Sequence, residues 1–492
     1  MSTAPRSSAG SSAPSTLTPE LAIIGSGSGN SLITPFWDDK HVVLAEKGLG
    51  PDAVFGGTCL NVGCIPTKMF VRPAEIARGP EEAARLDVVQ RTESVDWPAM
   101  RDRIFSRVDA ISAGGRRYRD EELENVDLLS EKVRLTGPRS FVGESGTQVD
   151  AERLVLAAGS RPILPNIPGM DLPQVHTSDT VMRLEQQPRR VLIVGSGFVA
   201  CEFAAIFSGL GSEVVQLART ERLMRTADDE ISVAFTSEAA RHWRLRTSTS
   251  LESVAAAGDG AAATARLRDA EGTVEDLDVD VVLVAIGRRP NTDLIGASEA
   301  GLDLHDDGRL VVDAHQRVVA DGEPVEGVYA LGDISSDHQL KHVANHQARV
   351  VAHNLEHPGD LRRSRTEAVP SAVFTHPELA QVGLTEPEAV AAIGSENVTT
   401  KVQDYGDTAY GWAMEDQVGL YKVIADRRDG RLLGAHVMGH QASLLIQPVV
   451  QAMSFGQDAH TAARGQYWIH PALMEVAENA LLGLDVPVGE EL

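Results

Sequence analysis

Cys59 and Cys64 are the two residues whose type and spacing most clearly suggest chemistry. They lie in a Gly-rich stretch, from Gly56 to Lys68, that reads Gly-Gly-Thr-Cys-Leu-Asn-Val-Gly-Cys-Ile-Pro-Thr-Lys. The whole chain of 492 residues has only three cysteines, so the use of two of them at this spacing indicates a function. We interpret the pair as a redox-active dithiol that cycles with its disulfide.

The spacing of the cysteines places a demand on the local backbone. In a regular α-helix, residues five apart are separated by about 7.5 Å along the axis, whereas a disulfide needs Cα atoms within about 7 Å of each other. The segment must therefore be bent, which Gly63 would permit. Zinc binding is disfavoured because it needs about four ligands at shorter spacing and the chain has no second cysteine pair. Two buried, inert cysteines remain the alternative.

A Gly-rich loop near the start of the chain predicts a nucleotide site. The run from Leu21 reads Leu-Ala-Ile-Ile-Gly-Ser-Gly-Ser-Gly-Asn, and its continuous apolar part is typical of a buried parallel strand. Gly25, Gly27 and Gly29 would allow a tight turn and a close approach to a pyrophosphate. Glu46 ends the next apolar run, about 20 residues on, where an acid can bind ribose hydroxyls. For the glycine pattern alone, an ordinary strand and turn is the alternative.

The segment after this loop departs from the usual pattern. Asn30 occupies the sixth position of the motif, where glycine or alanine is expected. The following residues include Pro35 and Trp37 and form a poor helix sequence. We therefore expect the first crossover to be short or distorted.

A second nucleotide fingerprint begins at Val191. A strand, Val-Leu-Ile-Val, is followed by Gly195-Ser-Gly197-Phe-Val-Ala and then by an apolar helical stretch from Cys201. Two such fingerprints in one chain strengthen each other and imply two nucleotide cofactors. We therefore expect electron transfer from one cofactor to the other.

The end of the next apolar run predicts which nicotinamide cofactor binds. Ala218 stands where an acid would bind the ribose of NAD, and Arg219 follows it. Arg222 and Arg225 come soon afterwards. Arginine can bind a 2′-phosphate with two hydrogen bonds, so we predict NADPH rather than NADH. A solvated basic helix end is the alternative.

Two further glycine turns resemble each other. Arg153 to Pro162 and Asp280 to Pro290 each read as a buried strand that ends in a turn, at Gly159 and Gly287 respectively. Gly332 and Asp333 also follow a strand, where an acid could bind ribitol or ribose hydroxyls or could simply cap a helix.

The C-terminal part of the chain carries a candidate acid/base pair. From about Thr366 the alternating pattern predicts an antiparallel sheet with helices over Leu444 to Ser454 and Ala472 to Leu482. His470 precedes a proline, and Glu475 follows five residues later, where it could orient the imidazole. A structural histidine is the alternative.

Core helices are predicted earlier, between Pro73 and Leu123. Ile104, Val108 and Ile111 recur there at helical spacing, which indicates a buried stripe.

Composition limits the class of protein. A chain of this length should form three or four folding units. The formal net charge of −25 works against nucleic acid and anionic membranes as partners. No apolar run is long enough for a transmembrane helix, and the few cysteines favour a reducing, cytoplasmic location. The Ser/Ala/Pro-rich start has no signal-peptide core, and we expect it to be disordered.

These landmarks, in this order, resemble the flavin-dependent pyridine nucleotide–disulfide oxidoreductases. The resemblance runs from about Thr18 to Leu484. The stretch from Gly56 to Lys68 carries it most specifically. Other details resemble the mycothione reductase subgroup: the Asn30 and Pro35 departures, Tyr-Gly-Asp at Tyr405, Tyr-Gly-Trp-Ala-Met-Glu-Asp at Tyr410, and Ala-Arg-Gly-Gln-Tyr-Trp-Ile-His-Pro-Ala-Leu at Ala463.

The resemblance implies an α/β fold with two Rossmann-like dinucleotide-binding domains and a C-terminal α+β dimerisation domain. We expect a disordered tail over 1–17, an FAD-binding domain over 18–165, an NADPH-binding domain over 166–288, a central domain completing the FAD site over 289–365, and the dimerisation domain over 366–492. The expected FAD residues are Gly25, Gly27, Gly29, Glu46, Thr58, Lys68, Gly159, Gly332 and Asp333. Those for NADPH are Gly195, Gly197, Glu202, Arg219, Arg225 and Gly287.

The resemblance also implies a mechanism. Cys64 would be the thiolate against the flavin and Cys59 the thiol that attacks a disulfide substrate. Lys68 would pair with Glu202 near the flavin. The chain would form a homodimer in which His470 and Glu475 serve the other subunit's cysteines.

Alternatives remain open at this point. A dihydrolipoyl dehydrogenase would use NAD, against which Ala218 and Arg219 count, and a mercuric reductase would have a C-terminal cysteine pair that this chain lacks. A flavoprotein kept for binding or regulation is the alternative from another class. The substrate, mycothione, rests on the resemblance, and no role is predicted for Cys201.

Overall fold

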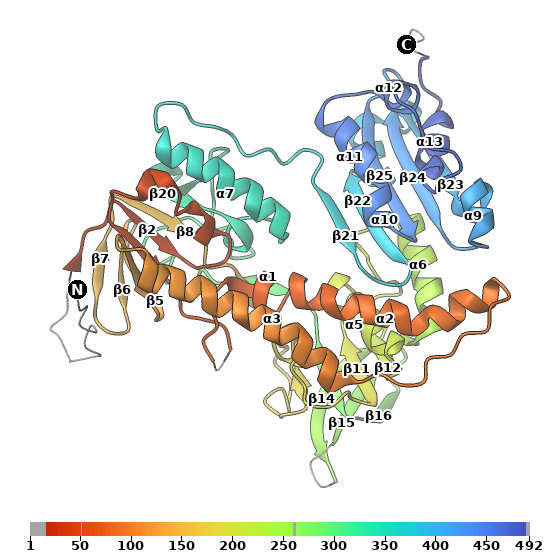
Figure 1. Ribbon diagram of the computed structural model, residues 1–492, viewed down its shortest axis with the longest axis horizontal. Coiled ribbons are helices and arrows are strands. Elements are labelled where there is room, and N and C mark those ends of the chain that lie inside the picture. The colour runs from red at the N-terminus through yellow and green to blue at the C-terminus, as the bar shows by residue number, and fades with distance from the viewer. Residues whose placement is uncertain (1–15, 51, 259–261, 489–492) are drawn as a thin grey trace, which may run out of the picture. The chain divides into compact units, whose positions relative to one another are not determined.

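The computed structural model describes residues 16–50, 52–258 and 262–488. The chain forms two compact units, each built from three separate segments (Figure 1). The first unit comprises Met1–Cys64, Ser106–Arg161 and Arg289–Ser364, and the second comprises Ile65–Phe105, Pro162–Arg288 and Arg365–Leu492.

The first unit is built on a six-stranded sheet of order β19-β20-β8-β2-β3-β4. All neighbouring pairs are parallel except β19 with β20. The inner strands are buried along their length, which explains their continuous apolar sequences. Helix α7 (Lys341–Glu356) packs against this sheet (Figure 1). The strands are β2 (Leu21–Ile24), β3 (Val42–Ala45), β4 (Val126–Leu129), β8 (Arg153–Leu156), β19 (Arg317–Ala320) and β20 (Glu323–Ala330).

The crossover between β2 and β3 contains two short 3₁₀ turns instead of an α-helix. They span Gly29–Leu32 and Pro35–Trp37. The side chains of Leu32 and Trp37 are fully buried in the core beside the sheet. The prediction of a short, distorted crossover is confirmed, and the proline at the start of the second turn accounts for the break.

A smaller sheet in the first unit has the order β1-β7-β6-β5. Its strands are β1 (Thr16–Leu17), β7 (Gln148–Asp150), β6 (Ser140–Gly143) and β5 (Val133–Gly137). Because β1 pairs with β7, the tail expected over 1–17 is too long by two residues. Residues 1–15 lie outside the described residues, so their disorder stays a prediction.

Two long helices occupy the region where core helices were predicted. They are α2 (Cys64–Arg85) and α3 (Trp97–Arg117). Ile104 and Val108 are buried as expected, but the prediction for Ile111 is wrong, because this side chain is 52% exposed. The buried stripe continues instead to Ser112, four residues after Val108. The hydroxyl of Ser112 donates a hydrogen bond to the Phe55 carbonyl at 2.7 Å.

The second unit contains a five-stranded parallel sheet of order β10-β17-β11-β12-β13. Its elements are β10 (Val175–His176), α4 (Ser178–Val181), β11 (Arg190–Val194), α5 (Phe198–Gly209), β12 (Glu213–Leu217), α6 (Asp229–His242), β13 (Arg244–Arg246) and β17 (Val281–Val284). A three-stranded antiparallel sheet, which was not predicted, is formed by β14 (Ser250–Ala257), β15 (Ala262–Arg268) and β16 (Val274–Val279).

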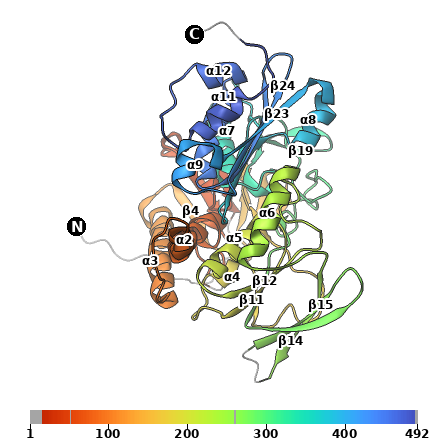
Figure 2. The ribbon, with the colours of Figure 1, turned by 90° about the vertical axis from the view of Figure 1, so that its right-hand side faces the viewer.

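The last part of the second unit is the predicted antiparallel sheet, of order β21-β22-β25-β24-β23. Helix α8 (Glu386–Ile393) packs on one face, and helices α10 to α13 pack on the other (Figure 2). The last helix begins at Glu475, not at Ala472 as expected. The remaining elements are β21 (Pro370–Val373), β22 (Glu378–Gly383), β23 (Val398–Asp404), α9 (Ala409–Ala413), β24 (Leu420–Asp426), β25 (Leu432–Gly439), α10 (Ala442–Leu445), α11 (Gln447–Ser454), α12 (Ala459–Arg464) and α13 (Glu475–Leu482).

These elements form the expected α/β architecture: two Rossmann-like sheets and a C-terminal α+β part. In the described ranges, no helix is both long and apolar enough to cross a membrane.

Candidate active site

The two cysteines lie on either side of a break between helices. Helix α1 (Gly57–Asn61) contains Cys59, and α2 begins at Cys64. A side chain at Gly63 would approach the Thr58 carbonyl oxygen to 3.0 Å, so a glycine suits this close turn. The bend predicted from the spacing is therefore present.

The two thiols share a hydrogen bond. Neither cysteine is in a disulfide here. The hydrogen bond to Cys64 raises the pKa of Cys59, as does burial, whereas the ammonium of Lys341 acts in the opposite direction. The hydrogen bond and the burial therefore both favour the protonated form of Cys59.

The first Gly-rich loop is packed too closely for side chains. Gly25 has φ of +108°, and a Cβ there would collide with the Ala157 carbonyl. A Cβ at Gly29 would lie 2.8 Å from that of Ala157, and one at Gly57 would lie 2.6 Å from the Cα of Gly27. The loop therefore presents backbone to whatever lies at its open side, as phosphate binding requires.

Ser26 connects this loop to the ribose-binding candidate and to the cysteine segment. The Oε2 of Glu46 accepts hydrogen bonds from the Ser26 N–H at 2.7 Å and from its hydroxyl at 2.5 Å. The Ser26 Oγ in turn accepts from the Gly56 N–H at 2.8 Å. One serine thus fixes the position of the acid relative to the start of α1, where Thr58 and Cys59 lie.

The other expected FAD residues of the first unit follow parallel strands of the same sheet. Gly25 follows β2, Glu46 follows β3, Gly159 lies just after β8, and Asp333 lies just after β20. Asp333 Oδ2 accepts from the Ser160 hydroxyl at 2.6 Å, and Gly332 N–H donates to Gln347 at 2.8 Å. Carboxyl ends of parallel strands meet at one edge, which is where dinucleotides bind. These residues fit a dinucleotide such as FAD.

Lys68 lies in the second unit, one helical turn after Cys64 in α2. Its Nζ is 3.1 Å from Glu202 Oε1, on helix α5, so the expected ion pair is present. The ammonium also lies over the ring of Phe374, 3.3 Å from the centroid.

The second Gly-rich loop is bound to the arginine-bearing turn. Gly195 follows β11, and Gly197 is the N-cap of α5. The N–H of Met224, which lies between Arg222 and Arg225, donates to the Ser196 carbonyl at 2.8 Å. This bond holds the turn beside the loop.

The arginines of this turn differ in their partners. Arg222 pairs with Asp229 at 3.1 Å. Arg219 and Arg225 are exposed and form no ion pair with any described residue. Ala218, in the position of the missing acid, is buried. The geometry therefore fits an anionic 2′-phosphate on the nucleotide. Gly287, the last expected residue of this site, follows β17 with φ of +140°.

Cys201 is a packing residue of the second loop. Its thiol contacts the Ser196 carbonyl at 3.7 Å and the Gln216 amide at 3.6 Å. Burial raises the pKa of Cys201 to about 12, so it stays protonated. It is therefore unsuited to thiolate chemistry.

His470 and Glu475 form the predicted pair. His470 Nδ1 lies 2.7 Å from Glu475 Oε1, and the imidazole is 71% exposed. The second oxygen of Glu475 is buried without a hydrogen-bond partner among the described residues. With Nδ1 held by the carboxylate, Nε2 is the nitrogen available to exchange a proton with a substrate.

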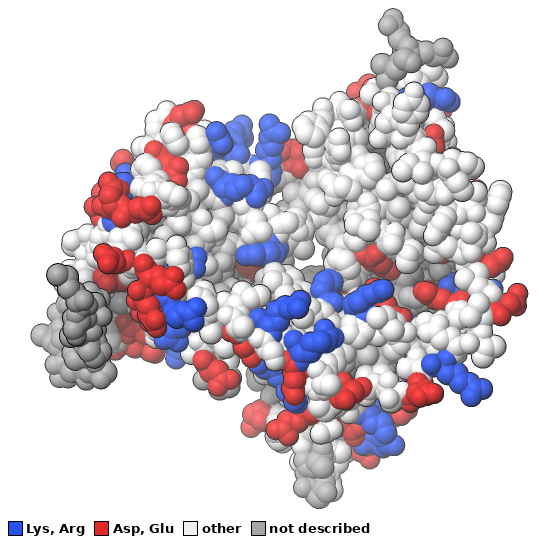
Figure 3. Space-filling model, in the orientation of Figure 1, with Lys and Arg blue, Asp and Glu red and all other residues white. Residues whose placement is uncertain are grey.

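The C-terminal part of the chain, which contains this histidine, exposes large apolar side chains. Few charged residues lie on the face over α9 to α13 and β23 to β25 (Figure 3). The exposed side chains of this part of the chain include Trp412, Leu444, Phe455, Tyr467 and Ile469. Such a surface is typical of a protein interface.

Comparison with known proteins identifies the family. The model of the pyridine nucleotide-disulphide oxidoreductases matches residues 19–348, and the dimerisation domain of the same family matches residues 369–481. The chain belongs to this family. Membership of this family agrees with the two cofactors, FAD and NADPH, that were predicted for this chain.

Relatives of this chain include enzymes of more than one name within the family. A mycothione reductase of Mycobacterium tuberculosis is 47% identical, over 94% of this chain and 99% of the relative. A dihydrolipoyl dehydrogenase of Chlamydia muridarum is 31% identical, over 95% of this chain and 97% of the relative. The HOCl-induced flavoprotein disulfide reductase RclA of Escherichia coli shares the fold, with a TM-score of 0.79 and 24% identity over 94% of this chain and 99% of that structure.

Several residues that interact with the expected site residues were not singled out from the sequence. Three of them, Ser26, Ser160 and Phe374, contact expected site residues, and the ammonium of Lys341 acts electrostatically on the pKa of Cys59. The serines lie inside the motifs and could have been singled out there. Lys341 and Phe374 carry no local signal, because only the fold brings them to their partners.

Proposed function

We propose that this chain is an NADPH-dependent disulfide reductase that acts on mycothione. The observation that carries the proposal is the hydrogen-bonded pair Cys59 and Cys64 at the break between α1 and α2, in a chain 47% identical over nearly its full length to a mycothione reductase. A reducing, cytoplasmic location is part of the proposal.

The proposed mechanism begins with the cofactors. FAD, when bound, would supply the two-electron transfer between NADPH and the cysteine pair. The Gly25 loop, Thr58, Gly159, Gly332 and the carboxylates of Glu46 and Asp333 would hold FAD. The Gly195 loop and Gly287 would hold NADPH, with Arg219 and Arg225 on its 2′-phosphate. The Lys68 ammonium, held by Glu202, would face the flavin.

The cysteines divide the disulfide chemistry between them. Cys59 gives up its proton and attacks one sulfur of the substrate, which forms a mixed disulfide and releases one thiol. Cys64 then attacks the Cys59 sulfur, re-forms the Cys59–Cys64 disulfide and releases the second thiol. The raised pKa of Cys59 means that a base must take its proton.

His470 would be that base, and later the acid that protonates the leaving thiolate. Glu475 orients the ring and stabilises the imidazolium through Nδ1. We propose that the chain is a homodimer in which His470 serves the cysteines of the other subunit. The exposure of His470 on a surface rich in apolar side chains supports this assignment.

Dihydrolipoyl dehydrogenase is the second candidate. A relative of that name is 31% identical over almost the whole chain. Arg219 and the buried Ala218 disfavour it, since NAD carries no 2′-phosphate and its ribose needs an acid.

Replacement of Cys59 by serine tests the proposed function. Cys59→Ser should abolish NADPH oxidation that depends on mycothione, because the attacking sulfur is gone, while the purified protein stays yellow with one FAD per chain. Wild type should be assayed in parallel with mycothione, oxidised glutathione and lipoamide. Activity that survives in Cys59→Ser would refute the role of the cysteine, and a preference for lipoamide with NAD would favour the second candidate.

A further inference from the structure

The ammonium of Lys68 is held by two elements of the second unit, helix α5 and the segment that follows β21. Glu202 on α5 accepts from Lys68 Nζ at 3.1 Å. Phe374, just after β21, contributes both its ring, 3.3 Å from Nζ to the centroid, and its backbone N–H, which donates to Glu202 Oε1 at 2.9 Å. A single carboxylate oxygen therefore accepts two hydrogen bonds, and Phe374 contacts both members of the ion pair.

The ring and the N–H of Phe374 restrict the ion pair in different ways. The backbone N–H fixes the position of the Glu202 carboxylate, because the main chain after β21 cannot move freely. The aromatic face attracts the ammonium and shields it from water. The ion pair is only partly exposed, at 33% for the Lys68 side chain and 14% for Glu202, so these attractions are less screened than at an open surface.

A lysine without such a cover would behave differently. Its ammonium is strongly hydrated and sits on a flexible four-carbon chain, so many positions would be populated. Here the Phe374 ring covers one side of the ammonium and so reduces the number of positions that it can occupy. The position of the positive charge is then set jointly by the nucleotide-binding helix α5 and by the segment that follows β21.

We propose that Phe374 is a positioning residue, which holds the Lys68 ammonium in place and so raises the reduction potential of the flavin. The proposal rests on the proposed function, in which Lys68 faces FAD. A flavin gains negative charge when it is reduced, and a fixed cation beside it favours that change. Without the ring, the charge is spread over more positions and its effect on the flavin weakens.

The test compares Phe374→Leu with Phe374→Tyr in the FAD-bound enzyme. Both variants keep the backbone N–H, but only tyrosine keeps an aromatic face. The measurement is the two-electron midpoint potential of the bound flavin, obtained by anaerobic photoreduction against a reference dye. Every variant is measured in a Cys59→Ser background, so that no cysteine disulfide takes the electrons from the flavin. Phe374→Leu should lower the potential, in the same direction as Lys68→Met and by less, and Phe374→Tyr should leave it near that of the wild type.

A double variant and a packing control make the test specific. In the presence of Lys68→Met, the further change Phe374→Leu should have no effect, because the ring acts through the ammonium. Phe235→Leu, which removes a buried ring from helix α6, should lower the melting temperature without moving the potential.

Three outcomes would overturn the proposal. The first is an unchanged potential in Phe374→Leu, and the second is an effect that persists in the Lys68→Met background. The third is a Lys68→Met potential equal to that of the wild type, which would also remove Lys68 from the flavin site. The Cys59→Ser assay does not depend on Lys68, so failure of this proposal and failure of the proposed function can be told apart.

Discussion

Charged side chains without a partner are the residue-scale sign of a missing ligand. Arg219 and Arg225 are exposed and lack an ion pair among the described residues, whereas Arg222 is already held by Asp229. The chain as a whole carries a net charge of −25, so the positive charge of this turn is opposite in sign to that of the rest of the chain. The Met224 N–H bond to Ser196 keeps the turn beside the second Gly-rich loop. The two free arginines are therefore available to an anionic group on the nucleotide.

Replacement of Arg219 by alanine should weaken the binding of NADPH but not that of NADH. A hydrogen bond to a charged group contributes about 1.5–3 kcal/mol, so we expect the KM for NADPH to rise roughly 10- to 100-fold. NADH lacks the 2′-phosphate, so its KM should change little. Steady-state kinetics with each nucleotide provide the measurement.

The matched control for this change is Arg189→Ala. Arg189 is another exposed arginine of the same sheet, but it lies just before β11, at the opposite end of the strand from the loop. Arg189→Ala should leave the KM for NADPH and the KM for NADH near those of the wild type. Equal losses for NADPH and NADH in Arg219→Ala would count against a 2′-phosphate contact.

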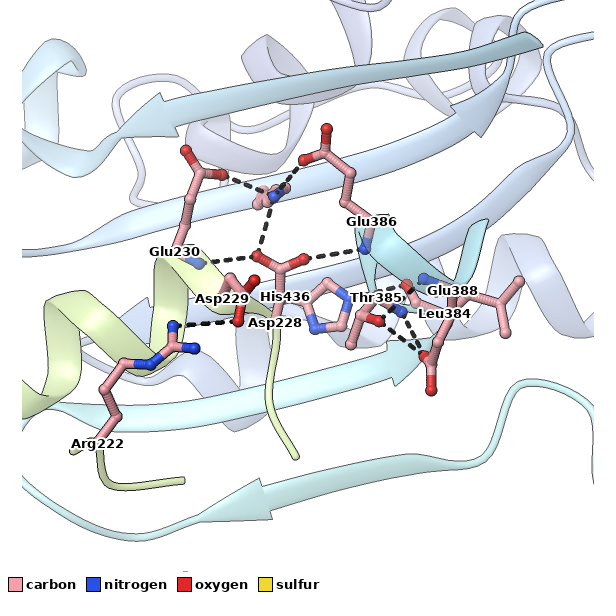
Figure 4. Close-up of polar contacts among 10 residues, drawn as sticks. Arg222, Asp228, Asp229, Glu230, Leu384, Thr385, Glu386, Glu388 and His436 are labelled. Carbon is pink, nitrogen blue, oxygen red and sulfur yellow. Dashed lines mark hydrogen bonds and ion pairs between the residues drawn. The ribbon is translucent and has the colours of Figure 1, made fainter. Parts of the chain in front are cut away.

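At the scale of elements, a buried ion cluster ties three of them together in the second unit. Lys422 on β24 lies 2.9 Å from Asp228 at the N-cap of α6, 2.7 Å from Glu230 and 2.7 Å from Glu386 at the start of α8 (Figure 4). The side chains of Lys422 and Asp228 are 2% and 0% exposed. The Glu386 N–H also donates to Asp228.

The cluster overcomes the cost of burying charge. Burial would raise the pKa of Asp228, but the Glu386 N–H and the Lys422 ammonium outweigh it, so the pKa is lowered overall. Lys422 likewise has a raised pKa despite its burial. The buried charges of Lys422 and Asp228 therefore depend on each other, whereas Glu230 and Glu386 are 56% and 41% exposed and can be solvated without Lys422.

Replacement of Lys422 by methionine should destabilise the protein strongly. Removal of one partner from a buried ion pair costs about 3–5 kcal/mol, and here Asp228 would remain buried with its charge. Denaturant unfolding of the FAD-bound enzyme, followed by circular dichroism, should show the loss.

Arg427→Met is the comparison for that change. Arg427 follows β24 directly and forms an exposed ion pair with Asp485 at 3.2 Å. Surface pairs of this kind contribute at most about 1 kcal/mol. If Lys422→Met and Arg427→Met lowered the free energy of unfolding by the same amount, the buried cluster would stabilise the protein no more than a surface ion pair does, and the prediction would be wrong.

At the scale of the whole molecule, the C-terminal part presents a surface that a single chain leaves open. It matches the dimerisation domain of the family, bears few charges on the face shown in Figure 3, and exposes large apolar side chains beside His470. Tyr467 and Ile469, next to the histidine, are among the most exposed of these. In the homodimer that we propose, a second copy of the chain would cover these side chains and would place its cysteines near His470 of the first copy.

Mixing two inactive variants tests this arrangement. If His470 serves the partner, co-expression of Cys59→Ser with His470→Gln should restore activity, because one site of each mixed dimer combines an intact Cys59 with an intact His470. Random pairing makes half of the dimers mixed, so about a quarter of the wild-type sites should work. Activity with mycothione and NADPH is the measurement.

Two results would contradict this prediction. No recovery in mixed dimers, verified by differently tagged chains, would mean that each subunit uses its own His470. Activity of His470→Gln alone near that of the wild type would remove the histidine from the chemistry, since loss of a general acid normally costs about 10²- to 10⁴-fold.

Much of the fold and of the candidate site could be predicted from local sequence. The two Gly-rich loops were recognisable because backbone that passes within van der Waals distance of another chain segment has no room for a Cβ, as at Gly25 and Gly195. The break at Gly63 followed from the cysteine spacing alone. The distorted crossover followed from Pro35, whose ring and missing N–H act on its own turn.

The sequence by itself thus determined which chemistry the chain can carry, because cysteines, glycines and arginines act through their own structure at fixed spacing. Only the tertiary structure decided which distant groups complete that chemistry. Lys341 beside Cys59, Phe374 over Lys68 and the carboxylates around Lys422 come from elements far apart in the chain. Ile111 was misjudged for the same reason: the helical period marks a stripe, but the neighbours that the helix packs against select its edge. Burial and partner choice are properties of the packed chain, and no local pattern encodes them.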